Sequence, residues 1–135
     1  MRSDEGKNGP GRAKLHRAGE DYLKTILALQ IEYGGVHSAD VAKELNVSKA
    51  SVCNAIKRLR ADGFLTMAPN KLLRLTDQGR EAAEQMLERH AILKRCLVVM
   101  GVDPDTAQED ACRMEHAVSP ETVERMRRFV LQVGD

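Results

Sequence analysis

Three side chains that commonly bind metals lie close together near the end of the sequence: Cys112, Glu115 and His116. In a helix, the spacing i, i+3 and i+4 places a thiol, a carboxylate and an imidazole on one face. Thiolate and imidazole suit borderline transition metals, and a carboxylate extends the choice to the harder Mn(II) and Fe(II). The pattern therefore predicts a site for a divalent transition metal on the helix that carries these residues.

The same three residues also have an ordinary structural interpretation. A cysteine is often a buried filler residue, a glutamate is usually solvated, and a histidine near the C-terminus of a helix is favoured by the helix dipole. Spacing alone does not decide between this interpretation and a ligand set, so both stay open at this point.

A second region has the charge expected of a surface that contacts nucleic acid. Residues 48–74 carry six basic side chains and one acidic one, a net charge of +5, in a chain whose net charge is only +1. Positive charge concentrated in one segment of a nearly neutral protein favours contact with a polyanion. A basic surface that is merely solvated is the alternative.

This basic region overlaps a predicted helix-turn-helix unit at residues 38–62. Ser38 and Ser48 are each expected to cap a helix, Asn46 and Val47 form the turn between the helices, and Gly63 ends the second one. Small Ala42 stands where the helices would cross, and the apolar contacts between them are expected from Val41, Leu45, Val47, Val52, Ile56 and Leu59.

The second helix of this unit has a polar front that suits the major groove. Asn54 can pair with adenine through two hydrogen bonds, whereas Lys57 and Arg58 suit phosphates. Two short apolar segments, 64–67 and 72–75, then predict a β-hairpin that forms a wing. The residues expected to contact DNA are Ser48, Lys49, Ala50, Ser51, Asn54, Lys57, Arg58, Lys71 at the tip of the wing and Arg74 on its second strand.

The remaining pattern predicts a mainly α chain with this one hairpin. Tyr22, Ile26, Leu29 and Tyr33 recur at helical spacing and predict a helix over 17–33. Further helices are expected over 76–100 and after the pairs Asp103-Pro104 and Ser119-Pro120, because each pair places a capping side chain before proline at the first helical position.

Cysteine usage and hydropathy bear on the compartment. The three cysteines are an odd number without framework spacing, which favours free thiols in a reducing compartment. Cys96 is expected in the core, and Cys53 is expected to be a small filler residue rather than a thiol sensor. No apolar run approaches the roughly 20 residues of a membrane span, and the sequence does not open with a signal peptide, so we expect a cytoplasmic protein.

Several segments resemble the metalloregulators typified by the diphtheria toxin repressor and the manganese transport regulator. They are Glu20-Asp21-Tyr22-Leu23, the winged helix-turn-helix, Glu88-Arg89-His90, and Asp110-Ala-Cys-Arg-Met-Glu-His116 followed by Ser119. The resemblance covers about residues 17–133, and the run at 110–116 is its most specific part. Diphtheria-type members carry a further C-terminal domain, so in length this sequence is more similar to the manganese regulators.

The resemblance implies a primary metal site formed by Asp21, Cys112, Glu115 and His116. Cys112 is the diphtheria-type residue at a position where the manganese regulators have Glu, whereas Asp21 is the manganese-type residue where the diphtheria type has Met. Because the thiolate favours Fe(II) and the aspartate favours Mn(II), this hybrid set leaves the choice between the two metals open.

The second metal site of the family is altered in this sequence. His90 is kept, but Lys94 stands where the diphtheria type has Glu, Gln108 replaces a His, and Lys24 stands where the manganese type has a second acidic ligand. Two ammonium groups near His90 would repel a second cation. We therefore expect one metal ion per subunit, with His90 more a packing or hydrogen-bonding residue than a ligand.

The implied organisation is a tail over 1–16, expected to be disordered, a winged helix-turn-helix DNA-binding domain over 17–76, and a helical metal-binding and dimerisation domain over 77–135. The implied function is a metal-dependent transcriptional regulator of metal-homeostasis genes, usually a repressor, activated by Fe(II) or Mn(II). It would bind a palindromic operator in double-stranded DNA as a homodimer, without enzymatic activity or membrane attachment.

Three other classes of protein stay open from the sequence. A winged-helix transcription factor that does not respond to metal would keep the DNA contacts and show no gain in affinity with metal. A metalloenzyme would need an open coordination position and a substrate cleft, and no catalytic motif accompanies the ligands. A winged-helix scaffold that binds protein would bind DNA only weakly, with a strong dependence on salt.

Overall fold

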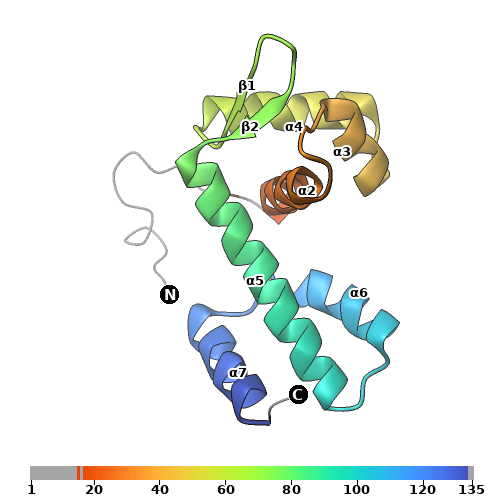
Figure 1. Cartoon of the computed structure of the whole chain (residues 1–135), viewed down its shortest axis with the longest axis vertical. Coiled ribbons are helices and arrows are strands. Elements are labelled where there is room, and N and C mark those ends of the chain that lie inside the picture. Colours follow the sequence, from red (N-terminus) through yellow and green to blue (C-terminus); the bar gives the residue numbers. More distant parts are fainter. Residues whose placement is uncertain (1–14, 16, 134–135) are drawn as a thin grey trace. The chain divides into compact units, whose positions relative to one another are not determined.

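The computed structural model describes residue 15 and residues 17–133; the tail predicted over residues 1–16 lies outside this part except for Leu15. The described residues form a mainly α structure with one two-stranded sheet, which confirms the predicted fold class (Figure 1). In chain order the elements are α2 (Arg17–Tyr33), α3 (Ser38–Leu45), α4 (Lys49–Ala61), β1 (Leu65–Met67), β2 (Leu73–Leu75), α5 (Asp77–Val99), α6 (Pro104–Met114) and α7 (Pro120–Val133).

The chain divides into two compact units, residues 1–83 and 84–135. Helix α5 contributes its first turns to the first unit and the rest of its length to the second. In the described part of the chain, no helix is long and apolar enough to cross a membrane.

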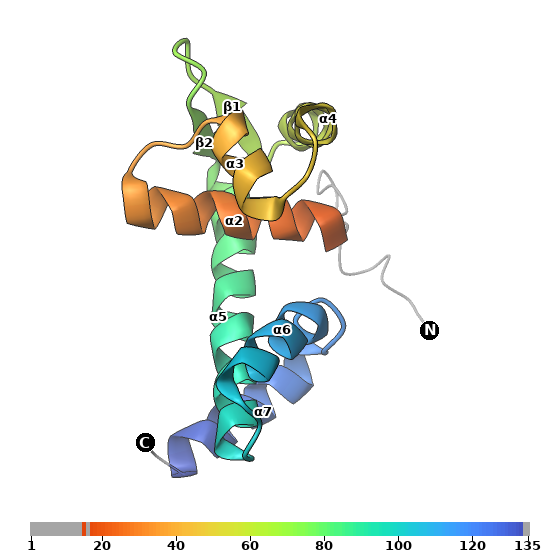
Figure 2. The ribbon, with the colours of Figure 1, turned by 90° about the vertical axis from the view of Figure 1, so that its right-hand side faces the viewer.

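The first unit is a winged helix. Helix α2 contacts α3, α4 and β2, and α4 also contacts α3 and β1. Figure 2 views α4 nearly end-on, with the hairpin beside it and α3 and α2 below it. The apolar side chains that fill this unit include Leu23, Ile26, Leu27, Val36, Val41, Val52, Ile56, Leu59, Phe64, Leu65 and Leu73, each less than one-tenth exposed.

The predicted helix over 17–33 is confirmed, but two apolar side chains of this unit are exposed. Tyr33 is 70% exposed, because it lies in the last turn of α2 beyond the elements that cover the rest of the helix. Val47 is 38% exposed, because it follows Asn46, which takes the left-handed conformation (φ 56°) that ends α3 and directs the chain toward α4.

The helix caps agree with the sequence at α4 and differ at α3. The Ser48 side chain accepts a hydrogen bond from the Ser51 backbone at 3.1 Å, so Ser48 caps α4 as predicted. In α3, however, the N-cap is His37 and not Ser38, which is the first helical residue. The backbone N–H of His37 donates to the Asp40 carboxylate at 2.8 Å. Asp40, the third residue of α3, thus satisfies the backbone N–H of the N-cap residue, as in a capping box.

The wing is a short antiparallel hairpin in which Leu65 pairs with Leu75 and Met67 with Leu73. Each strand begins one residue later than predicted. A third extended segment lies beside β2, because the N–H of Leu73 donates to the carbonyl of Val36 at 2.8 Å. At the tip, Lys71 takes a positive φ of 70°, which turns the chain back toward β2.

The start of α5 packs against the start of the hairpin. Thr76 donates its side-chain hydroxyl to the carbonyl of Gly63 at 2.7 Å, and the same hydroxyl oxygen accepts from the N–H of Gly79 at 3.0 Å. A Cβ on Gly79 would lie 2.0 Å from the carbonyl oxygen of Phe64, so only glycine fits this approach.

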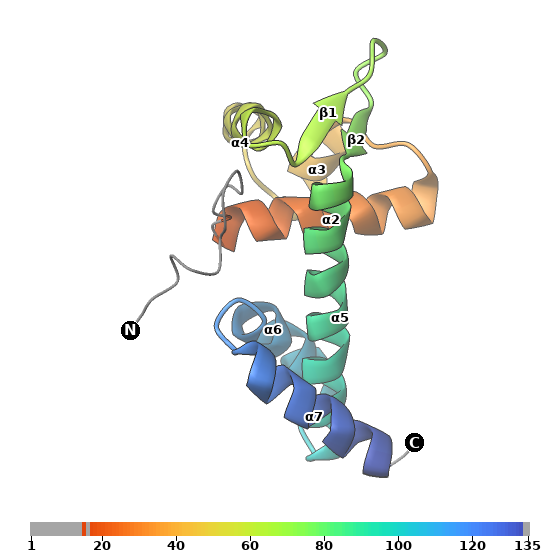
Figure 3. The same cartoon turned by 90° about the vertical axis from the view of Figure 1, so that its left-hand side faces the viewer.

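In the second unit, α6 and α7 pack against the C-terminal part of α5 (Figure 3). Asp103 and Ser119 cap these helices before the prolines, as predicted. Cys96 is buried between α5 and α7, where its thiol contacts the carbonyl of Met126 at 3.5 Å, so the prediction that Cys96 is a core residue is confirmed. Burial raises the pKa of this thiol.

Candidate metal centre and DNA-binding unit

The predicted ligand run lies at the end of α6 rather than wholly inside it. Cys112 is in the helix, Glu115 is its C-cap, and His116 belongs to the turn that follows. The prediction of one helical face for all three residues is therefore wrong for His116. The chain leaves the helix here because residues 115–118 must lead back to Ser119 and Pro120, which begin α7.

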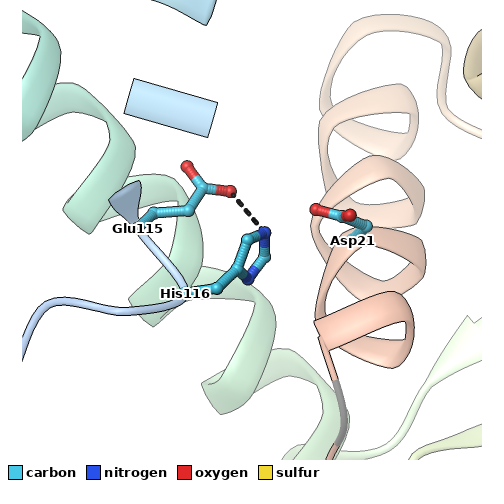
Figure 4. Close-up of side chains that lie close together, drawn as sticks. All are labelled: Asp21, Glu115 and His116. Atoms are coloured by element: carbon cyan, nitrogen blue, oxygen red, sulfur yellow. Dashed lines mark ion pairs between the residues drawn. The ribbon is translucent and has the colours of Figure 1, made fainter. Parts of the chain in front are cut away.

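Glu115 is the centre of this group. Its side chain is fully buried, with 0% exposure. One carboxylate oxygen, Oε1, lies 3.0 Å from Nδ1 of His90, and the other, Oε2, lies 3.6 Å from Nε2 of His116, as the dashed line in Figure 4 marks. Each oxygen of a buried carboxylate therefore faces an imidazole nitrogen.

His90 joins α5 to α6 through both ring nitrogens. Nδ1 contacts Glu115, and Nε2 lies 3.0 Å from the side-chain oxygen of Gln108. The thiol of Cys112 lies 3.8 Å from Nδ1 of the same ring. In the second unit, Cys112 and Glu115 thus lie next to His90, and His116 lies next to Glu115.

Arg89 fixes the backbone beside Glu115. One guanidinium nitrogen, Nη1, donates to the carbonyl of Glu115 at 3.1 Å and to the carbonyl of Val118 at 2.7 Å. These bonds satisfy carbonyls at the end of α6 that no helical N–H reaches. They hold the turn that carries His116 in one conformation.

Asp21 belongs to α2 in the first unit, as Figure 4 shows, and its side chain is half-buried. The second unit by itself supplies a carboxylate, a thiol and an imidazole, a set of oxygen, nitrogen and sulfur donors. A buried carboxylate flanked by imidazoles is costly unless a positive charge or hydrogen bonds compensate it, so the donor set fits a divalent transition metal.

A cluster of charged side chains joins α7 to α5. Arg127 donates to Glu88 of α5 at 2.6 Å and to Glu124 at 3.1 Å, and Arg128 donates to Glu124 at 3.2 Å. Hydrogen bonds from Arg127 and Arg128 lower the pKa of Glu124, and the bond to Glu88 raises the pKa of Arg127. Every carboxylate here has an arginine partner, so the cluster holds α7 on α5.

The predicted DNA-contacting residues gather on the open side of the winged helix. Val52, Ile56 and Leu59 are buried, so Asn54 and Lys57 lie on the opposite side of α4. The side chains of Lys49, Ala50, Ser51, Asn54, Lys57, Arg58, Lys71 and Arg74 are all exposed. Cys53 is also exposed, so it does not fill a gap in the core as predicted.

Ser48 also has a structural role in capping α4. Its hydroxyl accepts from the Ser51 N–H and also donates to the Ser51 hydroxyl at 3.0 Å.

A hollow between α4 and β1 adds to the basic surface. Lys57 and Arg60 line it together with Leu65, Thr66 and Met67, and its volume is about 450 Å³. Arg60 therefore lies beside the wing, next to Lys57.

Two functional positions in the second unit were missed. Gln108 was considered only as the replacement for a family ligand, and Arg89 only as part of a motif. Their partners, a ring nitrogen on α5 and two carbonyls after α6, are set by tertiary packing, which no spacing in the sequence reveals.

A winged helix with a basic recognition helix, joined to a helical unit with a buried cluster of donor atoms, defines the class of metal-responsive DNA-binding regulators. Residues 14–73 match the family described as "Iron dependent repressor, N-terminal DNA binding domain", and residues 76–133 match "Iron dependent repressor, metal binding and dimerisation domain". The chain belongs to this iron-dependent repressor family, which includes the regulators that the sequence was found to resemble.

Individual relatives agree with this assignment. The chain is 40% identical to the transcriptional regulator MntR of Salmonella typhimurium over 115 residues, which cover 85% of this chain and 73% of the relative. It is similar to the crystal structure of T. acidophilum IdeR (29% identity, TM-score 0.73, 87% of this chain and 55% of the other). It is also similar to a manganese-dependent transcriptional repressor solved with manganese (31% identity, TM-score 0.76, 83% and 52%). The chain spans about half the length of these two solved structures.

The family assigns the general function. The chain is a metal-responsive, DNA-binding transcriptional regulator and not an enzyme, with double-stranded DNA and a second copy of the chain as its partners. The alternatives of a metalloenzyme and a protein-binding scaffold are thereby set aside.

Proposed function

We propose that this regulator binds a palindromic operator as a homodimer in the cytoplasm and represses metal-homeostasis genes when one Fe(II) or Mn(II) ion per subunit is held by Asp21, Cys112, Glu115 and His116. The observation that carries the proposal is the buried Glu115 carboxylate with an imidazole nitrogen at each oxygen. The family match and the DNA-binding function of related proteins support the cytoplasmic location.

The donor set does not favour one metal alone. Cys112 supplies a soft thiolate that suits Fe(II), and two carboxylates suit the harder Mn(II). The comparisons name both metals: one similar solved structure is a manganese-dependent transcriptional repressor with manganese, and the matched family description names iron. When bound, the ion supplies a positive charge that the four donor atoms share.

The switch follows from where the ligands lie in the sequence. Asp21 is in the unit of residues 1–83, whereas the other three ligands are in the unit of residues 84–135. Ligands drawn from both units would hold α2, and with it the recognition helix, in one arrangement relative to the helical unit. Metal must bind the DNA-competent arrangement more tightly than the others, or it changes nothing.

The DNA contacts divide into two kinds. Ser51 and Asn54 are proposed to reach base edges, since both are exposed near the N-terminus of α4. Phosphate contacts are proposed for Lys49, Lys57, Arg58, Lys71 and Arg74, with Ala50 lying against the groove.

Titration of the metal-free protein with Co(II) tests the ligand set. Thiolate coordination gives an intense near-ultraviolet charge-transfer band, which we expect in the unmodified protein and not in Cys112→Ser. Asp21→Asn should keep the band with weaker affinity, because it removes one carboxylate and leaves the thiolate. Cys53→Ser is the matched control and should leave the spectrum unchanged. A band that survives Cys112→Ser would contradict the proposed set.

A further inference from the structure

We infer that the hollow between α4 and β1 is a binding site for a phosphodiester group of the DNA backbone, with Arg60 of the recognition helix and Thr66 of the wing as contact residues. Lys57 and Arg74, which are proposed above as phosphate contacts, border the same site. This inference deepens the proposed function and rests on it, because it requires DNA to meet this face of the winged helix. It also implies that the recognition helix and the wing hold the same stretch of backbone.

Helix α4 contributes two cations to the hollow. Lys57 and Arg60 are three residues apart, a spacing that places both side chains on one side of the helix, and both are exposed. Helix α4 and β1 lie side by side (Figure 3), and β1 lines the hollow with Leu65, Thr66 and Met67. The hollow has a volume of about 450 Å³. The planar guanidinium of Arg60 can donate two parallel hydrogen bonds to one phosphate there.

The wing adds a hydroxyl and a third cation. Thr66 pairs with Arg74 across the hairpin, and residues directly opposite each other in an antiparallel pair have neighbouring side chains on one face. Both side chains are exposed, whereas Leu65 and Leu73 are buried on the other face of the hairpin. The Thr66 hydroxyl can donate to a phosphate oxygen, as threonine commonly does in protein–DNA complexes.

The charges around the hollow favour an anion. Among the described residues, no acidic side chain lines it. Asp62 is the one acidic residue of segment 48–74, and it lines a different hollow, between α4 and α2, together with Arg58. Arg60 and Arg58 therefore have different surroundings, although they are only two residues apart. A phosphodiester of the DNA is the anion that a DNA-binding surface meets at this position.

Arg60 could instead serve only the fold. It lies in the last turn of α4, where a cation is favoured by the helix dipole. That role involves no DNA, so it predicts a lower melting temperature for a neutral variant and no change in the salt dependence of DNA binding. A phosphate contact predicts that the salt dependence changes, because the contact releases counterions from the DNA.

The test is fluorescence anisotropy with the full-length protein in the presence of Mn(II), over a series of salt concentrations. The probes are two duplexes of equal length: the DNA upstream of the protein's own gene and a scrambled sequence of the same composition. We expect Arg60→Gln to bind both duplexes about eightfold more weakly at about 0.1 M salt, because it forms one phosphate contact fewer. The slope of the logarithm of the binding constant against the logarithm of salt concentration should fall by about 1.

Three further variants separate charge, hydrogen bonding and folding. Thr66→Val removes a neutral donor, so it should weaken binding to both duplexes and leave the slope unchanged. Arg60→Lys keeps the positive charge and should keep the slope. Arg125→Gln, at an exposed position of α7, removes the same charge from the other unit and is the matched control, expected to bind as the unmodified protein does. Thermal unfolding checks that every variant is folded.

The outcomes separate this inference from the proposed function. An unchanged slope in folded Arg60→Gln, or a loss of affinity confined to the upstream duplex, would overturn the inference. If Lys57→Ala lowers the slope and Arg60→Gln does not, the proposed DNA-binding face stands and the phosphate site fails. If neither variant lowers the slope, the proposed phosphate contacts of α4 fail together with this site.

Discussion

At the scale of single residues, Glu115 shows what the metal site demands of the fold. A carboxylate is rarely buried completely, because the loss of water costs several kcal/mol unless hydrogen bonds or charges compensate it. Here His90 and His116 face its two oxygens and Arg89 holds its carbonyl. Each partner lies on a different side of Glu115, so the side chain has little freedom to turn away from a metal.

The residues on the recognition helix make a prediction about DNA specificity. Asn54→Ala should cost about 1–3 kcal/mol on the preferred operator and much less on variants changed at one base position, because a base contact carries sequence information. Lys57→Ala should weaken binding to all sequences alike, because a phosphate contact carries no sequence information. It should also reduce the slope of the logarithm of the binding constant against the logarithm of salt concentration by about 1.

Fluorescence anisotropy on a set of operator variants at several salt concentrations measures both effects. Each variant is the control for the other, since Asn54 and Lys57 are both exposed on the same side of α4. Equal losses on every sequence for Asn54→Ala would show that Asn54 does not read a base.

At the scale of elements, most of the fold was predictable from the sequence because capping residues and glycines mark the starts and ends of several helices. Ser48, Asp103 and Ser119 cap the helices that they were expected to cap, and Gly63 and Gly101 follow the ends of α4 and α5 with positive φ values. These signals are local, so a single sequence suffices to find them.

The candidate site was predictable only in part. The types and order of the residues at 112, 115 and 116 are visible in the sequence, and resemblance supplied Asp21. The hydrogen bonds of Gln108 and Arg89 were not predictable, because each joins α5 and α6 or the turn after α6 across 18 to 29 residues of sequence. The end of α6 at Met114 was missed because no glycine or proline marks it.

The contact between α5 and the hairpin makes a prediction about stability. Gly79→Ala should destabilise the protein by about 1–3 kcal/mol, because the new methyl group would overlap the Phe64 carbonyl and backbone would have to move. Thermal unfolding of the metal-free protein measures the loss. Gln85→Ala, on the exposed side of the same helix, should change the melting temperature little, and equal melting temperatures for Gly79→Ala and the unmodified protein would contradict the close approach.

The ion-pair cluster on α7 makes a prediction about pH. Hydrogen bonds to arginines lower the pKa of Glu124 below its ordinary value of 4.5. The folded state then binds fewer protons than the unfolded state, so this stabilisation is complete above pH 4.5 and is lost as pH falls through the folded pKa.

Urea unfolding at neutral pH and at about pH 3 tests this sign. The unmodified protein should lose more stability on acidification than Glu124→Gln, and Glu109→Gln on α6 should behave like the unmodified protein. A larger loss in Glu124→Gln would contradict the assignment of the arginine partners.

At the scale of the whole molecule, the helical unit must also form the dimer. The family description assigns dimerisation to residues 76–133. Within this range, Phe129 and Val133 are 43% and 46% exposed and lie on one face of α7 with the half-buried Met126 and Val130. Leu131, 73% exposed, lies on the opposite face of the helix.

We expect Phe129→Glu to shift the protein from dimer toward monomer in sedimentation experiments, because a charge in an apolar interface must lose its water. Leu131→Glu is the matched control, with the same change of charge on the other face. A dimer that Phe129→Glu leaves intact would place the interface elsewhere in this unit.

The central claim is that a metal ion controls DNA binding through this donor set. The most direct test is fluorescence anisotropy on a fragment of the DNA upstream of the protein's own gene, with chelator, with Fe(II) under anaerobic conditions and with Mn(II). We predict that one metal tightens binding by about tenfold or more, a coupling within the usual range for allosteric proteins, and that Cys112→Ala removes the gain. Equal affinity with chelator and with either metal would contradict the account and leave a winged-helix factor that does not respond to metal.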